Sequence, residues 1–296
     1  MDQDPKMEKE ILQDSELILN PDGSIYHLKL REEHVADTVI LVGDQGRVAA
    51  ISKFFDRVDH KIQNREFVTH SGVYKSKPIT VLSTGIGTDN IDIVLNELHA
   101  AANIDLENRR FKADHRPLNL IRVGTSGSLQ ADIPAGAHII SEFGLGLDGL
   151  IYYYNYEFDS EEAALRDEIN VHLKWNSDLA VPYLVKGSST LIERIGHDMT
   201  KGITATATGF YGPQGRRLGL PLSNETMNES LQSFASGQHR ITNFEMETSA
   251  LYGLGKMLGH HCCTCCLILA NREKKEFIEN HDEAMDGLIQ VVLERV

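Results

Sequence analysis

The sequence has few residues that could build a disulfide framework or cross a membrane. It contains four cysteines in 296 residues, and all four lie within Cys262–Cys266, too close together to tie distant loops as secreted scaffolds do. No apolar run approaches the ~20 residues that a bilayer span needs, and Met1–Asp14 lacks the apolar core of a signal peptide. These absences predict reduced thiols, no membrane partner and a soluble protein of the cytoplasm.

Positive charge is also scarce. The chain has 29 lysines and arginines against 43 acidic residues, a formal net charge of −14. A protein that binds the phosphate backbone of nucleic acid usually carries a broad basic surface, so no nucleic-acid partner is expected. A few arginines gathered in one place can still bind a small anion.

The cysteine cluster has the spacing of half a zinc site. Cys262 and Cys265, like Cys263 and Cys266, are separated by two residues, and two histidines come just before them. A β-strand, however, would point Cys262 and Cys265 to opposite faces, and no second ligand pair follows at the proper spacing. We therefore expect small apolar thiols packed in a buried strand and no metal site there.

The chain is expected to form one large domain after a polar tail. Residues 1–24 are rich in Asp, Glu, Lys and Gln, and they predict a tail that is partly disordered or laid on the surface. Residues 25–296 are long enough for one catalytic domain, and 41% apolar residues in the whole chain can bury a substantial core.

The pattern of short apolar runs predicts an α/β fold with a twisted mixed β-sheet flanked by helices. Runs rich in Val and Ile, expected as buried strands, are Thr38–Gly43, Ile79–Gly85, Leu118–Gly124, Ala137–Ser141, Gly202–Ala207 and His261–Ala270. Stretches with helical spacing between them are Asn90–Ala102, Glu161–Trp175 and Asn243–Leu258. The polar segment Asp105–Pro117 is longer than a usual connection and predicts a surface insertion.

Four strand ends carry glycines that could admit a ligand close to the backbone. They are Gly43–Arg47, Ser83–Gly87, Arg122–Gly127 and Phe210–Arg216. Taken singly, each could be an ordinary tight turn with a solvated arginine. The phosphate loop of nucleotide triphosphatases and the Gly-x-Gly-x-x-Gly of dinucleotide-binding dehydrogenases are both absent from the sequence, so neither class is supported.

Eight short motifs follow one another along the chain in the order seen in the uridine phosphorylase branch of the nucleoside phosphorylase family, which the sequence therefore resembles. Between Ile25 and Glu276 they are Tyr26-His27-Leu28, Gly43-Asp44 with Arg47, Asn64-Arg65-Glu66-Phe67, Ser83-Thr84-Gly85-Ile86-Gly87, Ile121 to Gly127, Phe210-Tyr211 with Gln214 and Arg216, Phe244-Glu245-Met246-Glu247, and Asn271-Arg272. The resemblance implies phosphorolysis of uridine, and of deoxyuridine, to uracil and ribose 1-phosphate or its deoxy counterpart. Inorganic phosphate is then a co-substrate, and no organic cofactor is needed.

The resemblance implies a phosphate site made mainly of arginines. Arg47, Arg65 and Arg122 would hold the dianion, and Gly43 and Thr125 would add backbone and hydroxyl donors. Arginine suits this role because it stays protonated at working pH. The alternative for these side chains is ion pairing on the surface of an acidic chain.

For the ribose, the resemblance implies His27, Met246 and Glu247. The Glu247 carboxylate can accept hydrogen bonds from the 2′ and 3′ hydroxyls, and the Met246 thioether can pack against the sugar ring. Glu247 could instead complement the dipole of a helix that begins there, and His27 could be purely structural. The resemblance places His27 and Arg65 in the site of a neighbouring subunit, which implies a homo-oligomer, either a dimer or a hexamer.

The base pocket implied by the resemblance contains Phe210, Gln214, Arg216 and Arg272. An amide offers a donor and an acceptor in one plane, which matches the O2 and N3–H edge of uracil, and an arginine can meet a carbonyl oxygen. Phe210 would stack on the base and Arg272 would support the O4 side. The residues expected to act in catalysis are Arg122, Gln214, Arg216 and Glu247, through positioning and electrostatic stabilisation.

Three features depart from the family pattern. Thr208 and Gly209 stand just before Phe210 without an acidic residue, the Asp105–Pro117 insertion is unusual, and the Ser83 loop continues into Thr88-Asp89-Asn90. Some relatives hold potassium at the position of Glu66, so a monovalent cation is a further expectation that the altered loop weakens. A hydrolytic nucleosidase and a non-catalytic nucleoside-binding protein are the alternative functions on the same fold.

Overall fold

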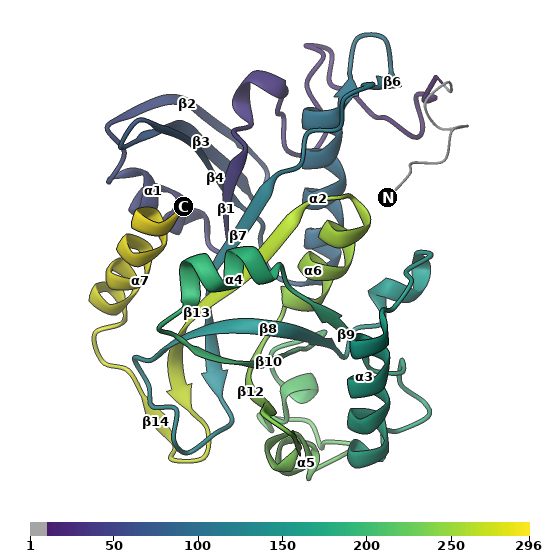
Figure 1. Cartoon of the computed structure of the whole chain (residues 1–296), viewed down its shortest axis with the longest axis vertical. Helices are drawn as coiled ribbons and strands as arrows, with labels where there is room; N and C mark the ends of the chain where they lie inside the picture. Colours follow the sequence, from purple (N-terminus) through teal and green to yellow (C-terminus); the bar gives the residue numbers. More distant parts are fainter. Residues whose placement is uncertain (1–10) are drawn as a thin grey trace.

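A twelve-stranded mixed sheet forms the centre of the computed structural model, which describes residues 11–296 (Figure 1). Its main path runs β11-β12-β10-β8-β13-β7-β1-β4-β3-β2, with β14 beside β13 and β9 beside β8. The strands are β1 Thr38–Val42, β2 Arg57–Asn64, β3 Phe67–Tyr74, β4 Lys77–Ser83, β7 Asn119–Ser128, β8 His138–Gly146, β9 Tyr183–Lys186, β10 Thr200–Thr206, β11 Ala235–Ser236, β12 His239–Glu245, β13 His261–Asn271 and β14 Glu276–Phe277.

The sheet curls on itself, because β12 pairs with two strands that are far apart along the path. It runs parallel to β10 and also pairs antiparallel with the end of β7, where Phe244 lies opposite Gly127. This second pairing brings the carboxyl ends of β7, β12 and β13 together. Ligands of α/β proteins collect at such strand ends.

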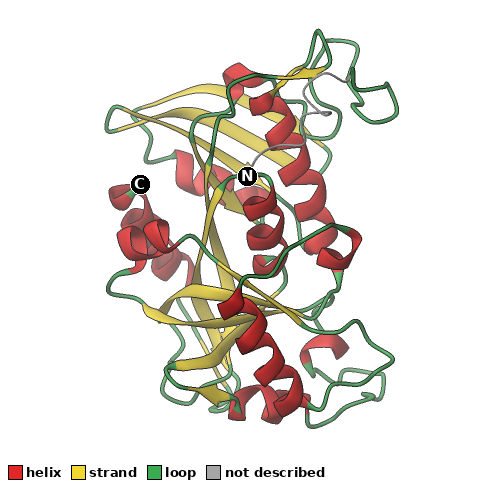
Figure 2. Ribbon diagram, turned by 45° about the vertical axis from the view of Figure 1, so that its right-hand side comes forward, coloured by secondary structure: helices red, strands yellow, loops and turns green. Residues whose placement is uncertain are grey.

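Helices cover both faces of the sheet (Figures 1 and 2). The helices are α1 Gln45–Ser52, α2 Thr88–Asn103, α3 Ser160–Leu173, α4 Ser189–Gly196, α5 Met227–Ser233, α6 Thr248–Met257 and α7 His281–Arg295, with short 3₁₀ turns at Glu32–His34, Leu150–Tyr153 and Gly212–Gln214. Strand β1 shows why both faces need cover. Val39 and Leu41 pack in the core cluster that includes α2 and α6, whereas Ile40 and Val42 pack in the one that includes α1, α4 and α7.

The sequence predicted much of this architecture. All six expected strands are present within a few residues, as are the helices expected at Asn90–Ala102 and Glu161–Trp175. The helix expected over Asn243–Leu258 was wrong at its start, because Asn243–Glu245 end strand β12 between β10 and β7, and α6 begins at Thr248.

The cysteines of β13 point alternately to the two faces of the sheet, as predicted. Cys262 packs in the core cluster with α2 and α6, while Cys263 and Cys265 pack in the cluster with α7. All four thiols are buried. Cys262 and Cys265 therefore lie on opposite faces of β13.

The insertion forms a small hairpin that contacts the N-terminal segment. Strands β5 (Ile104–Asp105) and β6 (Arg110–Phe111) pair with each other, and Arg109 Nε donates to the carbonyl oxygen of Leu12 at 2.8 Å. Leu17 is buried against the body. The first ten residues of the expected tail lie outside the described residues. From residue 11 onward, no helix combines the length and apolar character needed to cross a bilayer.

Candidate active site

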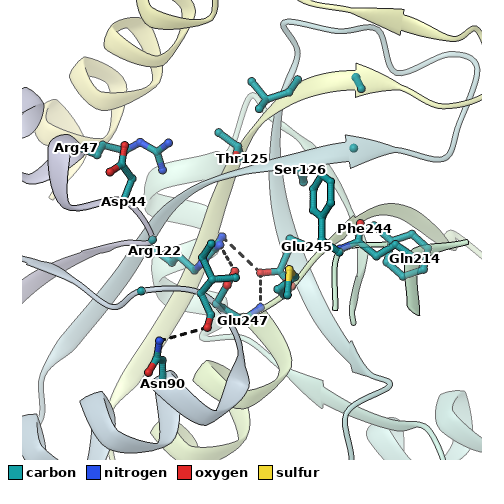
Figure 3. Close-up of a pocket in the computed structure, with 18 of the residues that line it drawn as sticks. Asp44, Arg47, Asn90, Arg122, Thr125, Ser126, Gln214, Phe244, Glu245 and Glu247 are labelled. Carbon is teal, nitrogen blue, oxygen red and sulfur yellow. Dashed lines mark hydrogen bonds and ion pairs between the residues drawn. The ribbon is translucent and has the colours of Figure 1, made fainter. Parts of the chain in front are cut away.

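A cavity of about 770 Å³ opens at the carboxyl ends of β1, β4, β7, β12 and β13 (Figure 3). It brings together ten of the residues singled out in the sequence: Gly43, Arg47, Glu66, Arg122, Thr125, Phe210, Gln214, Arg216, Met246 and Glu247. These residues come from segments as much as 204 positions apart, from position 43 to 247, so the curl of the sheet is what assembles them.

Three of the predicted residues do not line this cavity. Arg272 lies behind Gln214 and donates to it. Arg65 turns toward Tyr26, with its guanidinium carbon 5.5 Å from the ring centroid. His27 lines a separate cavity of about 730 Å³ beside α2.

Arg122 is held between two buried carboxylates at the centre of the cavity (Figure 3). Its Nη2 pairs with Glu247 Oε2, and its Nη1 lies 3.4 Å from Glu245 Oε2. Burial opposes the positive charge, but the two carboxylates outweigh it and raise the pKa of Arg122 above its ordinary value. Arg122 is therefore a fixed cation in the floor of the cavity.

Two carboxylates share that single guanidinium. Burial raises the pKa of Glu247, and Glu245 adds to the effect against the pull of Arg122. The backbone N–H of Gly87 donates to Glu247 Oε1 at 2.8 Å, which ties the carboxylate to the start of α2. Glu247 thus has one oxygen on Arg122 and one on Gly87, in a site whose other side is open to a ligand.

Glu245 is a buried residue of the site to which sequence reasoning gave no role, although it lies inside a motif that was recognised. It accepts hydrogen bonds from the Thr206 hydroxyl at 2.7 Å and from the backbone N–H groups of Glu247 and Thr248, each at 2.9 Å. An acidic residue two positions before Glu247 in a strand is the only sequence signal for this role. The partners across the sheet are visible only in three dimensions.

The side of the cavity next to α1 offers positive charge and backbone donors. Gly43, Asp44 and Gln45 line it at the first turn of α1, where the helix dipole favours an anion. Burial, together with the neighbouring charge of Arg122, lowers the pKa of Arg47 from its ordinary value. The Arg47 Nη1 atom lies 3.4 Å from the carbonyl oxygen of Val123.

The opposite side of the cavity is built around Gln214, whose side chain is buried. Its Oε1 accepts from Arg216 Nη1 at 2.7 Å and also from Arg272 Nη2. Both guanidinium groups hold the oxygen, and among the described residues none accepts from the Nε2 amide group, which is therefore available as a donor. The Arg216 guanidinium also lies over the Phe210 ring, 3.8 Å from its centroid, and burial lowers the pKa of Arg272 to about 10.

Away from this cavity, three histidines lie close enough together to suggest a metal site. In the described part of the chain, His99, His115 and His260 are the one group of His, Cys, Asp or Glu side chains with ligand atoms all within 4.8 Å of one another. The backbone N–H of Leu118, however, donates to His260 Nδ1 at 3.1 Å, so Nε2 of that neutral ring carries the proton. This Nε2–H faces His99 Nδ1 at 3.2 Å, so His99 and His260 form a hydrogen-bonded pair, whereas His115 Nε2 lies 3.0 Å from the carbonyl oxygen of Leu258.

The buried histidines predict acid-sensitive stability. Burial, helped by neighbouring histidines, lowers the pKa of His99 to about 4 and that of His260 to about 3. The unfolded chain binds protons at about pH 6.5, so stability is complete above that pH and falls as the pH drops toward 4, by up to about 1.4 kcal/mol per pH unit for each histidine. Urea unfolding at pH 7, 6 and 5 measures this slope. His99→Met should reduce the slope, whereas replacement of the exposed His281 by Ala should leave it unchanged, and equal slopes for both variants would contradict the assignment.

Comparison with known proteins places these features in a family. The family model described as "Phosphorylase superfamily" matches residues 37–296. Uridine phosphorylase of Thermococcus kodakarensis is 32% identical over 262 residues, which cover 86% of this chain and 80% of that protein. A DeoD-type purine nucleoside phosphorylase of Listeria welshimeri is 24% identical over 234 residues, covering 79% of this chain and 81% of its own length.

A solved structure supports the same family membership. The Trypanosoma brucei nucleoside phosphorylase described as showing uridine phosphorylase activity superposes with a TM-score of 0.85 at 32% identity. The match covers 94% of this chain and 98% of the trypanosome chain. The likeness therefore extends over the cavity and both helical layers.

Proposed function

The chain belongs to the phosphorylase superfamily, where it is a pentosyltransferase that acts on nucleosides, and we propose that its substrate is uridine. Uridine and inorganic phosphate would be converted to uracil and ribose 1-phosphate. Gln214 carries the proposal, because two arginines hold its carbonyl oxygen and leave a cavity side rich in hydrogen-bond donors. Such a side suits a base whose edge carries carbonyl oxygens.

The proposed reaction follows from the placement of the charges. Phosphate would lie between Arg47, Arg122 and Thr125 at the α1 side of the cavity, with Glu247 receiving the ribose hydroxyls and Met246 beside the sugar. A phosphate oxygen attacks C1′, the C1′–N1 bond breaks, and its electron pair passes to the base.

The departing base accumulates negative charge on its carbonyl oxygens. The Nε2 group of Gln214 and the guanidinium of Arg216 are the donors proposed to stabilise that charge, with Arg272 supporting them from behind. N1 then takes a proton from solvent. Positioning and electrostatic stabilisation account for these steps without a covalent enzyme intermediate, and phosphate is the only co-substrate proposed.

We also propose that the protein works as a homo-oligomer with shared sites. His27 and Arg65 lie outside the cavity of their own chain but next to each other, since the Arg65 Nη2 atom is 3.4 Å from the Tyr26 hydroxyl and Asn64 Nδ2 donates to the His27 carbonyl oxygen at 2.8 Å. Both would complete the site of a second copy. A monovalent cation near Glu66 stays a prediction.

The test is release of free base by the purified protein with and without phosphate, using uridine, deoxyuridine, inosine and adenosine. Phosphate-dependent release of uracil together with ribose 1-phosphate is the expected result. Release without phosphate would make the protein a nucleosidase, and faster cleavage of inosine would overturn the assignment of the base pocket. Binding of nucleoside without any cleavage would favour a binding protein.

A further inference from the structure

His27 is held by a carboxylate from the neighbouring helix. Glu97 of α2 accepts from His27 Nδ1 at 2.6 Å, through Oε1, and from the backbone N–H of Leu28 at 2.7 Å, through Oε2. The backbone N–H of His27 lies within 3.0 Å of both oxygens. One side chain therefore fixes both the backbone and the ring of residue 27.

This arrangement sets which ring nitrogen carries the proton. A carboxylate only accepts hydrogen bonds, so Nδ1 must be the donor and the lone pair of a neutral ring must be on Nε2. Among the described residues, none forms a hydrogen bond to Nε2, and 26% of the His27 side chain is exposed. His27 therefore presents an acceptor nitrogen outward.

We propose that Glu97 is a positioning residue, which holds His27 as the acceptor for the 5′ hydroxyl of a ribose bound in a second copy of the chain. The inference rests on the proposed function, in which His27 completes a neighbour's site. His27 and the Arg122 cavity are separate within one chain, so the recipient belongs to another copy. A carboxylate that accepts from the ring nitrogen facing away from the ligand is a general way to fix the tautomer of a histidine.

The competing explanation is that Glu97 simply anchors residues 27 and 28 to α2. Glu97→Gln separates the two roles, because an amide has one accepting oxygen and one donating nitrogen where the carboxylate has two acceptors. If the amide oxygen stays on the backbone N–H groups, the NH₂ group faces Nδ1 and drives the ring proton to Nε2. The exposed nitrogen then changes from an acceptor to a donor, so the 5′ hydroxyl can no longer donate to it and would have to accept in a different orientation.

The experiment compares uridine with 5′-deoxyuridine, which lacks the 5′ hydroxyl. Loss of one oriented hydrogen bond is expected to lower kcat/KM for uridine about tenfold in Glu97→Gln, mainly through KM, and to change 5′-deoxyuridine less than about twofold. His27→Ala should show the same selectivity, and the double variant should be no worse than His27→Ala. Asp92→Asn removes the same charge from the same helix without touching His27 and is the matched control.

Equal losses on both substrates would show that Glu97 is only an anchor and would overturn the proposal, as would unchanged uridine kinetics. Nitrogen-15 NMR of the imidazoles gives a readout that does not depend on activity. In the unsubstituted protein His27 Nε2 is expected to show the shift of an unprotonated nitrogen, and this shift should be lost in Glu97→Gln. A protonated Nε2 in the unsubstituted protein would overturn the tautomer assignment, whereas failure of that protein to cleave any nucleoside would overturn the proposed function and the ribose role with it.

Discussion

Gly124→Ala is expected to remove most of the activity while leaving the fold in place. A Cβ atom at position 124 would lie 1.9 Å from Arg122 Nη1 and 2.7 Å from its guanidinium carbon. Both residues point to the same face of β7, two positions apart, so the methyl group and the guanidinium compete for one space. The backbone around Gly124 need not move, because the far end of a long side chain can give way.

Displacement of Arg122 has two measurable costs. A phosphate-binding cation would leave the cavity, and loss of one such electrostatic contact typically lowers kcat roughly 10²- to 10³-fold. Glu245 and Glu247 would also lose their buried partner, which is expected to destabilise the protein by about 3 kcal/mol. Steady-state kinetics and urea unfolding measure the two effects.

Gly287→Ala is the control for this substitution. It lies in α7 with no atom within 4 Å of the added Cβ, so it should leave activity unchanged and raise stability slightly. Wild-type kinetics for Gly124→Ala would mean that Arg122 can shift without loss and is not part of the machinery.

Gln214→Ala is expected to raise KM for uridine about 100-fold, because a hydrogen-bond donor to the base is lost and two arginines lose their shared acceptor. Arg272 is the more affected of the two. Its Nε already lacks a hydrogen-bond partner among the described atoms, and its Nη2 would lose Gln214 Oε1 as well. Its Nη1 would keep the backbone carbonyl of residue 214, so the loop should stay near its place.

The comparison variant is Gln232→Ala, which removes the same side chain from α5, where it donates a hydrogen bond to Glu273 at 3.1 Å. Its KM for uridine should match that of the unsubstituted protein. KM values for phosphate should stay within about twofold in both variants, since Gln214 lies on the side of the cavity away from Arg47. Unchanged uridine kinetics in Gln214→Ala would exclude Gln214 from the base pocket.

Much of the fold followed from local patterns. Buried runs such as Thr38–Val42 and His261–Asn271 are apolar on both faces, and this is typical of a sheet covered by helices on each side. The boundary between β12 and α6 could not be predicted from local patterns. Phe244-Glu245-Met246-Glu247 leads into a segment of good helix formers, and only pairing with β10 and β7 keeps Asn243–Glu245 extended.

The sequence by itself indicated ten of the residues that line the cavity, through the order of its motifs and their resemblance to a known family. The tertiary structure decided how they are held. Glu245 beside Arg122 and Arg272 on the Gln214 oxygen both depend on how distant segments of the chain are brought together. A sequence records local periodicity and turn chemistry, whereas the distance between two side chains more than 50 positions apart is set by strand pairing, which only the folded chain defines.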